Sequence, residues 1–398
     1  MILNLCPYWV YPPTGGGPLR VYNLNKYISD KIPINQFSFR PTYIMKKRGM
    51  NILSSNVVKI KESYTEYRLS NPLVLLSSFL LYKLSLPPDF LLSRFSNLLR
   101  NKALYDSLVA ADIIQVEHPW LFDFAEKKAK DSLLVLSSHN CEFVLFKKYI
   151  NRRSINRLVE NALWELEKRS VENADVVFVV SEDDLKSFRE VLNVKRKRNV
   201  FIIPNGVDSN KLKKVSKDER KQAKKQLGFY DKKVILFTGS IHPPNLEAVK
   251  IIEERIARDF RTNDIVFLVV GSVGEKFKTH DNIIFTGYVE DIEPYIKAAD
   301  LAINPVITGS GTNLKMLEYM AYGLPVVTTK VGARGLGIKN KEQAVIADIP
   351  DFSYWIRELL DNEELYLKLS NNARQFVEER YDWRIIANKV VEIYKNFL

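Results

Sequence analysis

The stretch LAINPVITGSGTNLKMLEYM, residues 301–320, decides the fold of this chain. Its first six residues are apolar enough to form a buried strand, and Leu314, Leu317 and Ala321 place an apolar face along a following helix. The glycines between the two therefore mark a turn from a strand into a helix. Short apolar runs of this kind alternate with longer amphipathic runs along the whole chain, which predicts an α/β fold built on parallel sheets.

The glycine turn has the chemistry of a diphosphate site. Glycines let the backbone approach an anion without a Cβ in the way, and the free N–H groups at the start of a helix attract negative charge. Lys315 would add a positive charge for a phosphate, and Glu318 would accept hydrogen bonds from two adjacent ribose hydroxyls. A plain helix capped by Ser310 or Thr312 is the structural alternative. The residues expected to line the turn are Gly309, Ser310, Gly311, Thr312, Asn313 and Leu314.

Composition limits the class of protein. The chain has 398 residues, which is enough for two domains, and its 46% hydrophobic and 27% charged residues fit a globular protein. The net charge of +12 is uneven: residues 1–206 hold 30 Lys and Arg against 20 Asp and Glu, and residues 207–398 hold 29 against 27. The excess in the first half suits an acidic partner, such as anionic lipid headgroups or a phosphorylated acceptor.

The two cysteines carry little chemistry. Cys6 and Cys141 form no CxxC pair and the chain has four histidines, which argues against a disulfide framework and against a structural zinc site. We expect both thiols to be free and buried. The first residues show neither a basic segment nor a cleavage site, so we expect a cytoplasmic protein.

Residues 72–86 (PLVLLSSFLLYKLSL) form the most apolar segment. It contains Lys83 and is well short of the ~20 residues that span a bilayer. Two interpretations stay open, a helix packed in the core or an interfacial helix that lies on a membrane. We favour core packing, because segments of this length usually pack internally.

Several motifs together resemble the GT-B glycosyltransferases, specifically glycosyltransferase family 4. In chain order they are PPTGGGPLR (12–20), SSHNCE (137–142), ADVVFVVSEDD (174–184), IIPNGVD (202–208), FTGS (237–240), VVGS (269–272) and the long stretch 287–336 that contains the glycine turn. The resemblance implies two Rossmann-like parallel-sheet domains with a cleft between them. The first would span residues 1–206 and be completed by the C-terminal helix 381–398, and the second would span residues 207–380.

The resemblance also implies an activity, which is the retaining transfer of a sugar from a nucleotide-diphosphate sugar to a lipid-linked, glycan or protein acceptor. The donor would lie on the second domain and the acceptor on the first. The family places the second carboxylate of a paired motif at Glu318, whereas its first carboxylate falls at Ser310 here. The family's usual Arg and Lys after Gly239 are replaced by Ser240 and the segment 241–245. Phosphate binding would then depend on Lys315 and the glycine amides.

The first domain would supply further groups. The resemblance puts a sugar-contacting histidine at His139, which follows a strongly apolar predicted strand, with Glu142 beside it and His118 as a weaker candidate. The glycine run at Gly16 and Gly17 would present N–H groups to the donor phosphate from a flexible loop, with Arg20 nearby on the following helix.

No DxD motif is present, so we expect metal-independent transfer with no cofactor beyond the nucleotide sugar. The expected partners are that donor and an acceptor glycan or lipid-linked sugar, with peripheral membrane contact as an option and without nucleic acid. Two other functions stay open: a catalytically silent GT-B subunit that binds a partner transferase or a nucleotide sugar, which the missing motif residues motivate, and a GT-B epimerase or sugar-phosphate synthase.

Overall fold

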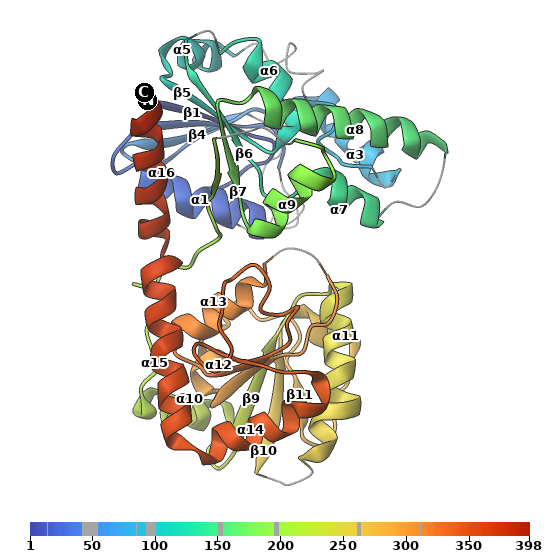
Figure 1. Ribbon diagram of the computed structural model, residues 1–398, viewed down its shortest axis with the longest axis vertical. Coiled ribbons are helices and arrows are strands. Elements are labelled where there is room, and N and C mark those ends of the chain that lie inside the picture. The colour runs from blue at the N-terminus through green and yellow to red at the C-terminus, as the bar shows by residue number, and fades with distance from the viewer. Residues whose placement is uncertain are drawn as a thin grey trace. The chain divides into compact units, whose positions relative to one another are not determined.

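The computed structural model describes residues 1–13, 15–41, 55–84, 86–92, 101–129, 131–149, 154–194, 199–260, 264–309 and 312–398. The chain divides into two compact units (Figure 1). Unit 1 comprises Met1–Pro204 and Trp383–Leu398, and unit 2 comprises Asn205–Asp382. The division falls inside the Pro-Asn-Gly turn at residues 204–206, where proline and glycine favour a break between elements.

Unit 1 is built on a sheet whose described strands follow the order β3-β4-β2-β1-β5-β6-β7-β8. All neighbouring strands are parallel except β3 and β4, which form an antiparallel pair at one edge. The strands are β1 (Ile2–Cys6), β2 (Ile34–Ser38), β3 (Asn56–Lys61), β4 (Tyr64–Arg68), β5 (Ile113–Glu117), β6 (Leu133–Ser137), β7 (Val176–Val179) and β8 (Val200–Ile202). The helices are α1 (Gly16–Ile28), α3 (Pro72–Lys83), α5 (Lys102–Ala110), η2 (Pro119–Leu121), α6 (Phe122–Glu126), α7 (Glu142–Tyr149), α8 (Ser154–Asn173), α9 (Glu182–Glu190) and α16 (Trp383–Phe397).

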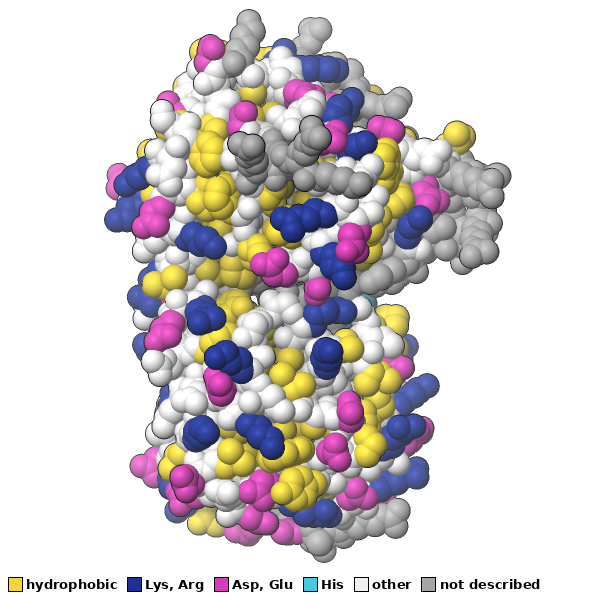
Figure 2. All heavy atoms as spheres, viewed as in Figure 1, with side chains coloured by type: hydrophobic (Ala, Val, Ile, Leu, Met, Phe, Trp, Pro, Cys, Tyr) yellow, Lys and Arg dark blue, Asp and Glu magenta, His cyan; other side chains and the backbone are white. Residues whose placement is uncertain are grey.

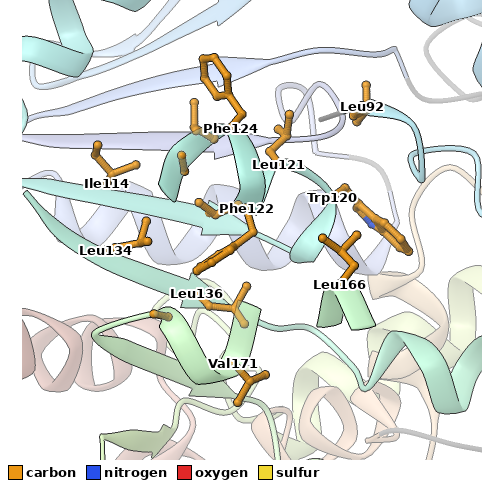
Figure 3. Close-up of a cluster of buried hydrophobic side chains, with 14 of the residues drawn as sticks. Leu92, Ile114, Trp120, Leu121, Phe122, Phe124, Leu134, Leu136, Leu166 and Val171 are labelled. Carbon is orange, nitrogen blue, oxygen red and sulfur yellow. The ribbon is translucent and has the colours of Figure 1, made fainter. Parts of the chain in front are cut away.

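Both faces of this sheet are covered, because successive strand residues point to opposite sides. Ile113 of β5 belongs to the core cluster that includes α1 and α16, and its neighbour Ile114 belongs to the cluster on the other face. Figure 3 shows the second cluster, in which Phe122 lies near Leu136 of β6. The central strands therefore consist of apolar residues with little polar alternation.

The last helix, α16, completes unit 1. Its buried side chains, among them Ile386, Val390 and Tyr394, join the core cluster with Ile2 and Leu24. The Tyr394 hydroxyl donates a hydrogen bond to the side-chain oxygen of Gln115 on β5. Residues at the end of the chain are thus part of the first core, which explains why the two units are not contiguous in sequence.

Unit 2 is built on a parallel sheet whose described strands follow the order β11-β10-β9-β12-β13-β14. The strands are β9 (Lys233–Thr238), β10 (Ile265–Val270), β11 (Ile283–Phe285), β12 (Leu301–Asn304), β13 (Val326–Thr328) and β14 (Val345–Ile346). The helical segments are α10 (Lys217–Leu227), α11 (Pro243–Ile251), η3 (Ile252–Ile256), η4 (Ala257–Asp259), η5 (Ser272–Lys276), α12 (Glu293–Ala298), α13 (Leu314–Ala321), η6 (Ile349–Asp351), α14 (Phe352–Asp361) and α15 (Glu363–Arg380). The strand, turn and helix predicted from residues 301–320 are β12, the glycine turn and α13.

Each sheet has one point at which the strand order reverses. In unit 1 the chain goes from β1 to β2 on one side and later adds β5 on the other; in unit 2 it goes from β9 to β10 and later adds β12. Open α/β sheets bind ligands outside the carboxyl ends of the strands at such a point. The residues that follow β1 and β5, and those that follow β9 and β12, are therefore the places to look for chemistry.

The apolar segment at residues 72–86 does not pack as we favoured. In α3 only Val74, Ser78 and Leu81 are buried, while most of its other apolar side chains are exposed. Core packing is therefore wrong for most of this helix, because only one of its faces joins the core cluster of unit 1. No helix among the described residues has both the length and the apolar character needed to cross a membrane.

Candidate active site

The first group of polar side chains lies at the carboxyl ends of β5 and β6 in unit 1. Strand β5 ends with Glu117 and continues into His118, and β6 is followed by the loop that carries His139. Because these strands are neighbours in the parallel sheet, their ends meet at one edge. The structure therefore brings together side chains that lie 22 residues apart in sequence.

Glu117 and His139 form a buried pair. The Nε2 atom of His139 lies 2.8 Å from Oε2 of Glu117. The carboxylate also accepts hydrogen bonds from the side chains of Asn4, at 3.2 Å, and Gln115, at 2.6 Å. Burial would raise the pKa of Glu117, but the close contact with His139 and, to a smaller extent, the hydrogen bond from Gln115 outweigh it and hold the pKa below its usual value. Burial and the neighbouring charge of His118 lower the pKa of His139 to about 3. An ionised Glu117 therefore faces a neutral His139, whose Nε2–H donates to it and whose Nδ1 is an acceptor that lies 3.5 Å from the Tyr8 hydroxyl.

His118 belongs to a second pair beside the first. Its Nδ1 lies 2.7 Å from Oε1 of Glu142, and its Nε2 lies 3.0 Å from the hydroxyl of Tyr8. The rings of His118 and His139 are 4.1 Å apart between centroids. Burial lowers the pKa of His118, but the hydrogen bond and charge of Glu142 outweigh it and raise the pKa overall. The backbone of His118 has φ +64°, which side-chain-bearing residues rarely adopt, so the surrounding bonds hold it in a strained position.

A buried glutamate fixes the loop that carries His139. Glu167 on α8 accepts hydrogen bonds from the backbone N–H groups of Glu142, at 2.7 Å, and Phe143, at 2.8 Å, which begin α7. Burial and the charge of Glu142 raise the pKa of Glu167 to about 8. The first turn of α7 is thus capped from another helix, which orients Glu142 toward His118.

The glycine run of unit 1 is not the flexible loop that we expected. Gly15 is the N-cap of α1 with φ +87°, and Gly16 and Gly17 form the first helical turn. A Cβ on Gly17 would lie 2.4 Å from the hydroxyl oxygen of Tyr8, so glycine is needed there for the close approach. A Cβ on Gly16 would meet no atom within 4 Å. Arg20, on the same helix, is buried and donates to the carbonyl oxygens of residues 203 and 204, at 2.7 and 2.9 Å.

The second group lies at the carboxyl ends of β9 and β12 in unit 2, and Lys315 is at its centre. The Lys315 ammonium donates a hydrogen bond of 2.9 Å to Oδ1 of Asn245 and lies 4.1 Å from the centroid of the Phe237 ring. Asn245 in turn donates to the carbonyl oxygen of Ser240 at 3.0 Å and packs against Gly239. Burial lowers the pKa of Lys315 to about 7, although the charge of Glu318 opposes this.

Glu318 lies one turn further along α13 and is half-buried. Burial raises the pKa of its carboxyl group, and the charge of Lys315 partly offsets the rise. The next residue, Tyr319, is fully buried and its hydroxyl accepts a hydrogen bond from the backbone N–H of Thr238 at 2.7 Å. This bond ties α13 to the end of β9, so that Lys315 and Glu318 keep their place relative to Gly239.

The turn before α13 starts with Gly309, whose φ of +116° favours glycine and whose Cα faces Pro244. Arg334 donates to the carbonyl oxygen of Gly309 at 3.2 Å. Ser310 and Gly311 lie outside the described residues. Helix α13 begins at Leu314, and its N-cap residue is Asn313, which makes no side-chain capping bond; Thr312 precedes it. The capped-helix alternative with Thr312 as the cap is therefore wrong, and the N-cap residue Asn313 makes no side-chain bond to the N–H groups of the first turn of α13.

The structure adds partners that the sequence motifs do not single out. Glu117, Tyr8, Glu167 and Asn245 each contact a residue that we predicted for the site. The position of Glu117 at the end of an apolar run was the only local signal among them. Of the remaining histidines, His280 is exposed and bonded to Glu253, and His242 is the N-cap of α11.

Comparison with known proteins gives a consistent result. Residues 232–362 match the family model described as glycosyl transferases group 1, and residues 70–211 match that of glycosyltransferase family 4. The chain is 22% identical to the uncharacterized glycosyltransferase MJ1069 of Methanocaldococcus jannaschii, over 100% of this chain and 98% of that protein.

Two solved structures show how far the likeness of the fold extends. Sucrose-phosphate synthase from Thermosynechococcus elongatus superposes with a TM-score of 0.72 at 17% identity, covering 100% of this chain and 98% of that one. HepE of Anabaena, solved in complex with UDP-glucose, superposes with a TM-score of 0.66 at 16% identity over 100% of both chains. At these identities the likeness concerns the fold.

Proposed function

We propose that this chain, which belongs to the group 1 glycosyltransferases of the GT-B fold, transfers a sugar from a nucleotide-diphosphate sugar to a hydroxyl of a glycan or lipid-linked acceptor, with retention at the anomeric carbon. Unit 2 binds the nucleotide diphosphate, and unit 1 supplies groups for the sugar. The HepE structure, which was solved in complex with UDP-glucose, supports this class of donor.

One observation carries the proposal: the Lys315 ammonium is held against Asn245 and the Phe237 ring. A lysine that is partly withdrawn from water and has a lowered pKa is unfavourable unless an anion completes its surroundings. Lys315 lies in the first turn of α13, where the side chain of the N-cap residue Asn313 does not bond to the backbone N–H groups, so that these groups can also bind an anion. A diphosphate supplies the missing negative charge for both. Lys315 thereby supplies the positive charge for the phosphates that the family's usual Arg and Lys after Gly239 would supply.

Glu318 is placed to hold the ribose of the same nucleotide. Its carboxylate follows Lys315 by about one helical turn, so both side chains lie on one face of α13. Two adjacent ribose hydroxyls donate hydrogen bonds, and a carboxylate is the group that accepts both. Phosphate and ribose contacts thus come from one short helix, which Tyr319 fixes to β9.

The chemical step breaks the bond between the anomeric carbon and the diphosphate oxygen. The acceptor oxygen forms the new bond to that carbon on the same face, and its proton passes to the departing diphosphate. The developing negative charge is stabilised by Lys315 and by backbone N–H groups. In unit 1, Nδ1 of His139, which lies 3.5 Å from the Tyr8 hydroxyl, accepts a hydrogen bond from a sugar hydroxyl, while Glu117 keeps the ring in the required tautomer.

The proposal is tested with a panel of UDP, GDP and ADP sugars, beginning with UDP-glucose. Donor binding is measured by thermal shift and slow donor hydrolysis by released nucleotide, each with EDTA and with Mg²⁺. We expect one donor class to stabilise the protein and to be hydrolysed equally in both conditions. Lys315→Met should lose this response, whereas the exposed control Lys278→Met should keep it. If no donor stabilised or were turned over, the proposal would be wrong.

A further inference from the structure

Helix α3 carries an exposed apolar surface that the proposed transfer reaction does not use. Five residues of the helix and its C-cap residue expose 48–71% of their large apolar side chains: Leu73, Leu76, Phe79, Leu80 and Tyr82 in the helix, and Leu84 at the C-cap. We call these six residues, together with the exposed Lys83, the α3 face. Single exposed apolar residues are common on protein surfaces, but contiguous patches of this kind mark binding surfaces.

The α3 face lies opposite the buried side of the helix. At 100° per residue, Val74, Ser78 and Leu81 point in one direction, and Leu76 and Phe79 point away from it. The buried side joins the core cluster of unit 1 through Val74 and Leu81. A helix that is apolar all round is normally covered on all sides. In this protein the core cluster of unit 1 covers one side of α3, and the opposite side needs another apolar medium.

Charge indicates what that medium is. Unit 1 holds 33 Lys and Arg against 21 Asp and Glu, whereas unit 2 holds 26 of each, so the whole net charge of +12 belongs to the unit that carries α3. Lys83 lies within the α3 face, with its ammonium 5.6 Å from the Phe79 ring. No Asp or Glu occurs from residue 69 to residue 88, and the next acid, Asp89, is buried and paired with Arg40.

The excess charge of unit 1 is not one dense patch on the face drawn in Figure 2, where basic and acidic side chains are interspersed. The α3 face combines apolar side chains with a lysine and lacks a carboxylate in the helix itself. That combination suits an anionic lipid surface, which offers an apolar layer beneath negatively charged headgroups. A protein partner would not require the surrounding unit to be basic.

We propose that the α3 face docks unit 1 onto an anionic lipid membrane. The helix has 12 residues and is about 18 Å long, against about 30 Å of hydrocarbon in a bilayer, so it lies in the interface and does not cross it. Leu76, Phe79 and Leu80 enter the acyl boundary, and Tyr82 and Lys83 reach the headgroup level. This inference does not depend on the proposed transfer reaction.

The test is flotation of the full chain with vesicles of phosphatidylcholine, alone or with about one third phosphatidylglycerol. We expect binding to the anionic vesicles that weakens at high salt but is not abolished, and weak binding to neutral ones. The variant Leu76→Glu/Phe79→Glu/Leu80→Glu should bind at least about tenfold more weakly, because it places three charges in the apolar layer.

A matched control separates this effect from a change in net charge. Val109→Glu/Leu158→Glu/Tyr354→Glu adds the same three charges at exposed apolar residues on α5, α8 and α14 and should bind anionic vesicles nearly as well as the unmodified protein. Circular dichroism and melting temperature establish that both variants fold. The proposal is overturned if the unmodified protein does not float at low salt, or if both triple variants lose binding equally.

The same variants address a second copy of the chain as the alternative occupant. Sedimentation velocity without lipid should show no self-association that depends on the α3 face. A dimer that the α3 triple variant dissociates, together with absence of vesicle binding, would show the face to be a protein interface and would overturn the proposal.

Discussion

The Nε2 atom of His139 lies 2.8 Å from the Oε2 atom of Glu117, and both side chains are buried at the carboxyl edge of the unit 1 sheet. Glu117 also accepts two side-chain amide hydrogen bonds and is therefore an ionised acceptor. This relationship fixes which nitrogen of His139 carries the proton. In the proposed transfer reaction His139 would therefore offer Nδ1, which lies 3.5 Å from the Tyr8 hydroxyl, as a hydrogen-bond acceptor, and mutation can measure the consequences.

Glu117→Gln should reduce turnover more than it reduces nucleotide affinity. The substitution removes a hydrogen bond to a charged group, which contributes about 1.5–3 kcal/mol, so we expect kcat to fall by roughly 10- to 150-fold. Steady-state kinetics and calorimetric titration of the nucleotide measure the two quantities. Glu190→Gln, which alters an exposed pair with Lys186, is the control and should behave like the unmodified protein. Equal activity of the two variants would mean that Glu117 does not orient His139.

His139→Ala should lower turnover while the affinity for the free nucleotide changes little, because His139 belongs to unit 1 and the proposed nucleotide site belongs to unit 2. The comparison of kcat with the dissociation constant of the nucleotide checks this split. Unchanged kcat would remove His139 from the site.

Gly17→Ala should impair activity through Tyr8. The new Cβ would lie 2.4 Å from the Tyr8 hydroxyl, so the ring must move away from His118, which it now contacts at 3.0 Å. We expect a several-fold loss of kcat that is not additive with Tyr8→Phe. Gly16→Ala is a close control, because it lies in the same helical turn with no atom near the new Cβ and should stabilise α1 by about 1 kcal/mol. If the losses of kcat in Gly17→Ala and Tyr8→Phe were additive, the effect of Gly17→Ala would not act through Tyr8.

Donor binding should take up a proton through Lys315. In the free protein burial lowers the pKa of Lys315 to about 7, so at pH 8 much of it is neutral, whereas a bound diphosphate favours the charged form and raises the pKa. Nucleotide affinity should therefore fall as the pH rises above about 7, by up to tenfold per pH unit. Calorimetry in buffers of different ionisation enthalpy counts the protons. Lys315→Arg keeps its charge over this range and should show neither proton uptake nor the pH dependence.

Glu318→Ala should weaken nucleotide binding by about 10- to 100-fold, because two ribose hydroxyls lose a charged acceptor. The variant should bind a nucleotide that lacks both hydroxyls as well as the unmodified protein does. Glu364→Ala, on an exposed part of α15, is the control for the loss of a carboxylate. An unchanged preference for the ribose hydroxyls in Glu318→Ala would contradict the assignment.

The α/β class and the strand, turn and helix of residues 301–320 followed from local periodicity, because burial on both faces makes the strands apolar runs. The antiparallel edge pair β3 and β4 carries no such signal, since the side chains of β3 are partly or fully exposed. The glycines at Gly16 and Gly17 suggested a loop, yet they begin a helix, and Tyr8 fills the space that Gly17 leaves.

The sequence by itself determined the fold class, the family and the residue types of the candidate site, since these depend on patterns within a few turns of the chain. The tertiary structure alone decided which partner each of these residues meets. Glu117 reaches His139 because β5 and β6 are neighbours, and Asn245 reaches Lys315 across 70 residues because α11 and α13 both begin at the same edge of the sheet. It also decided that α3 stays exposed, because the burial of an apolar helix depends on what packs against it and not on its own composition.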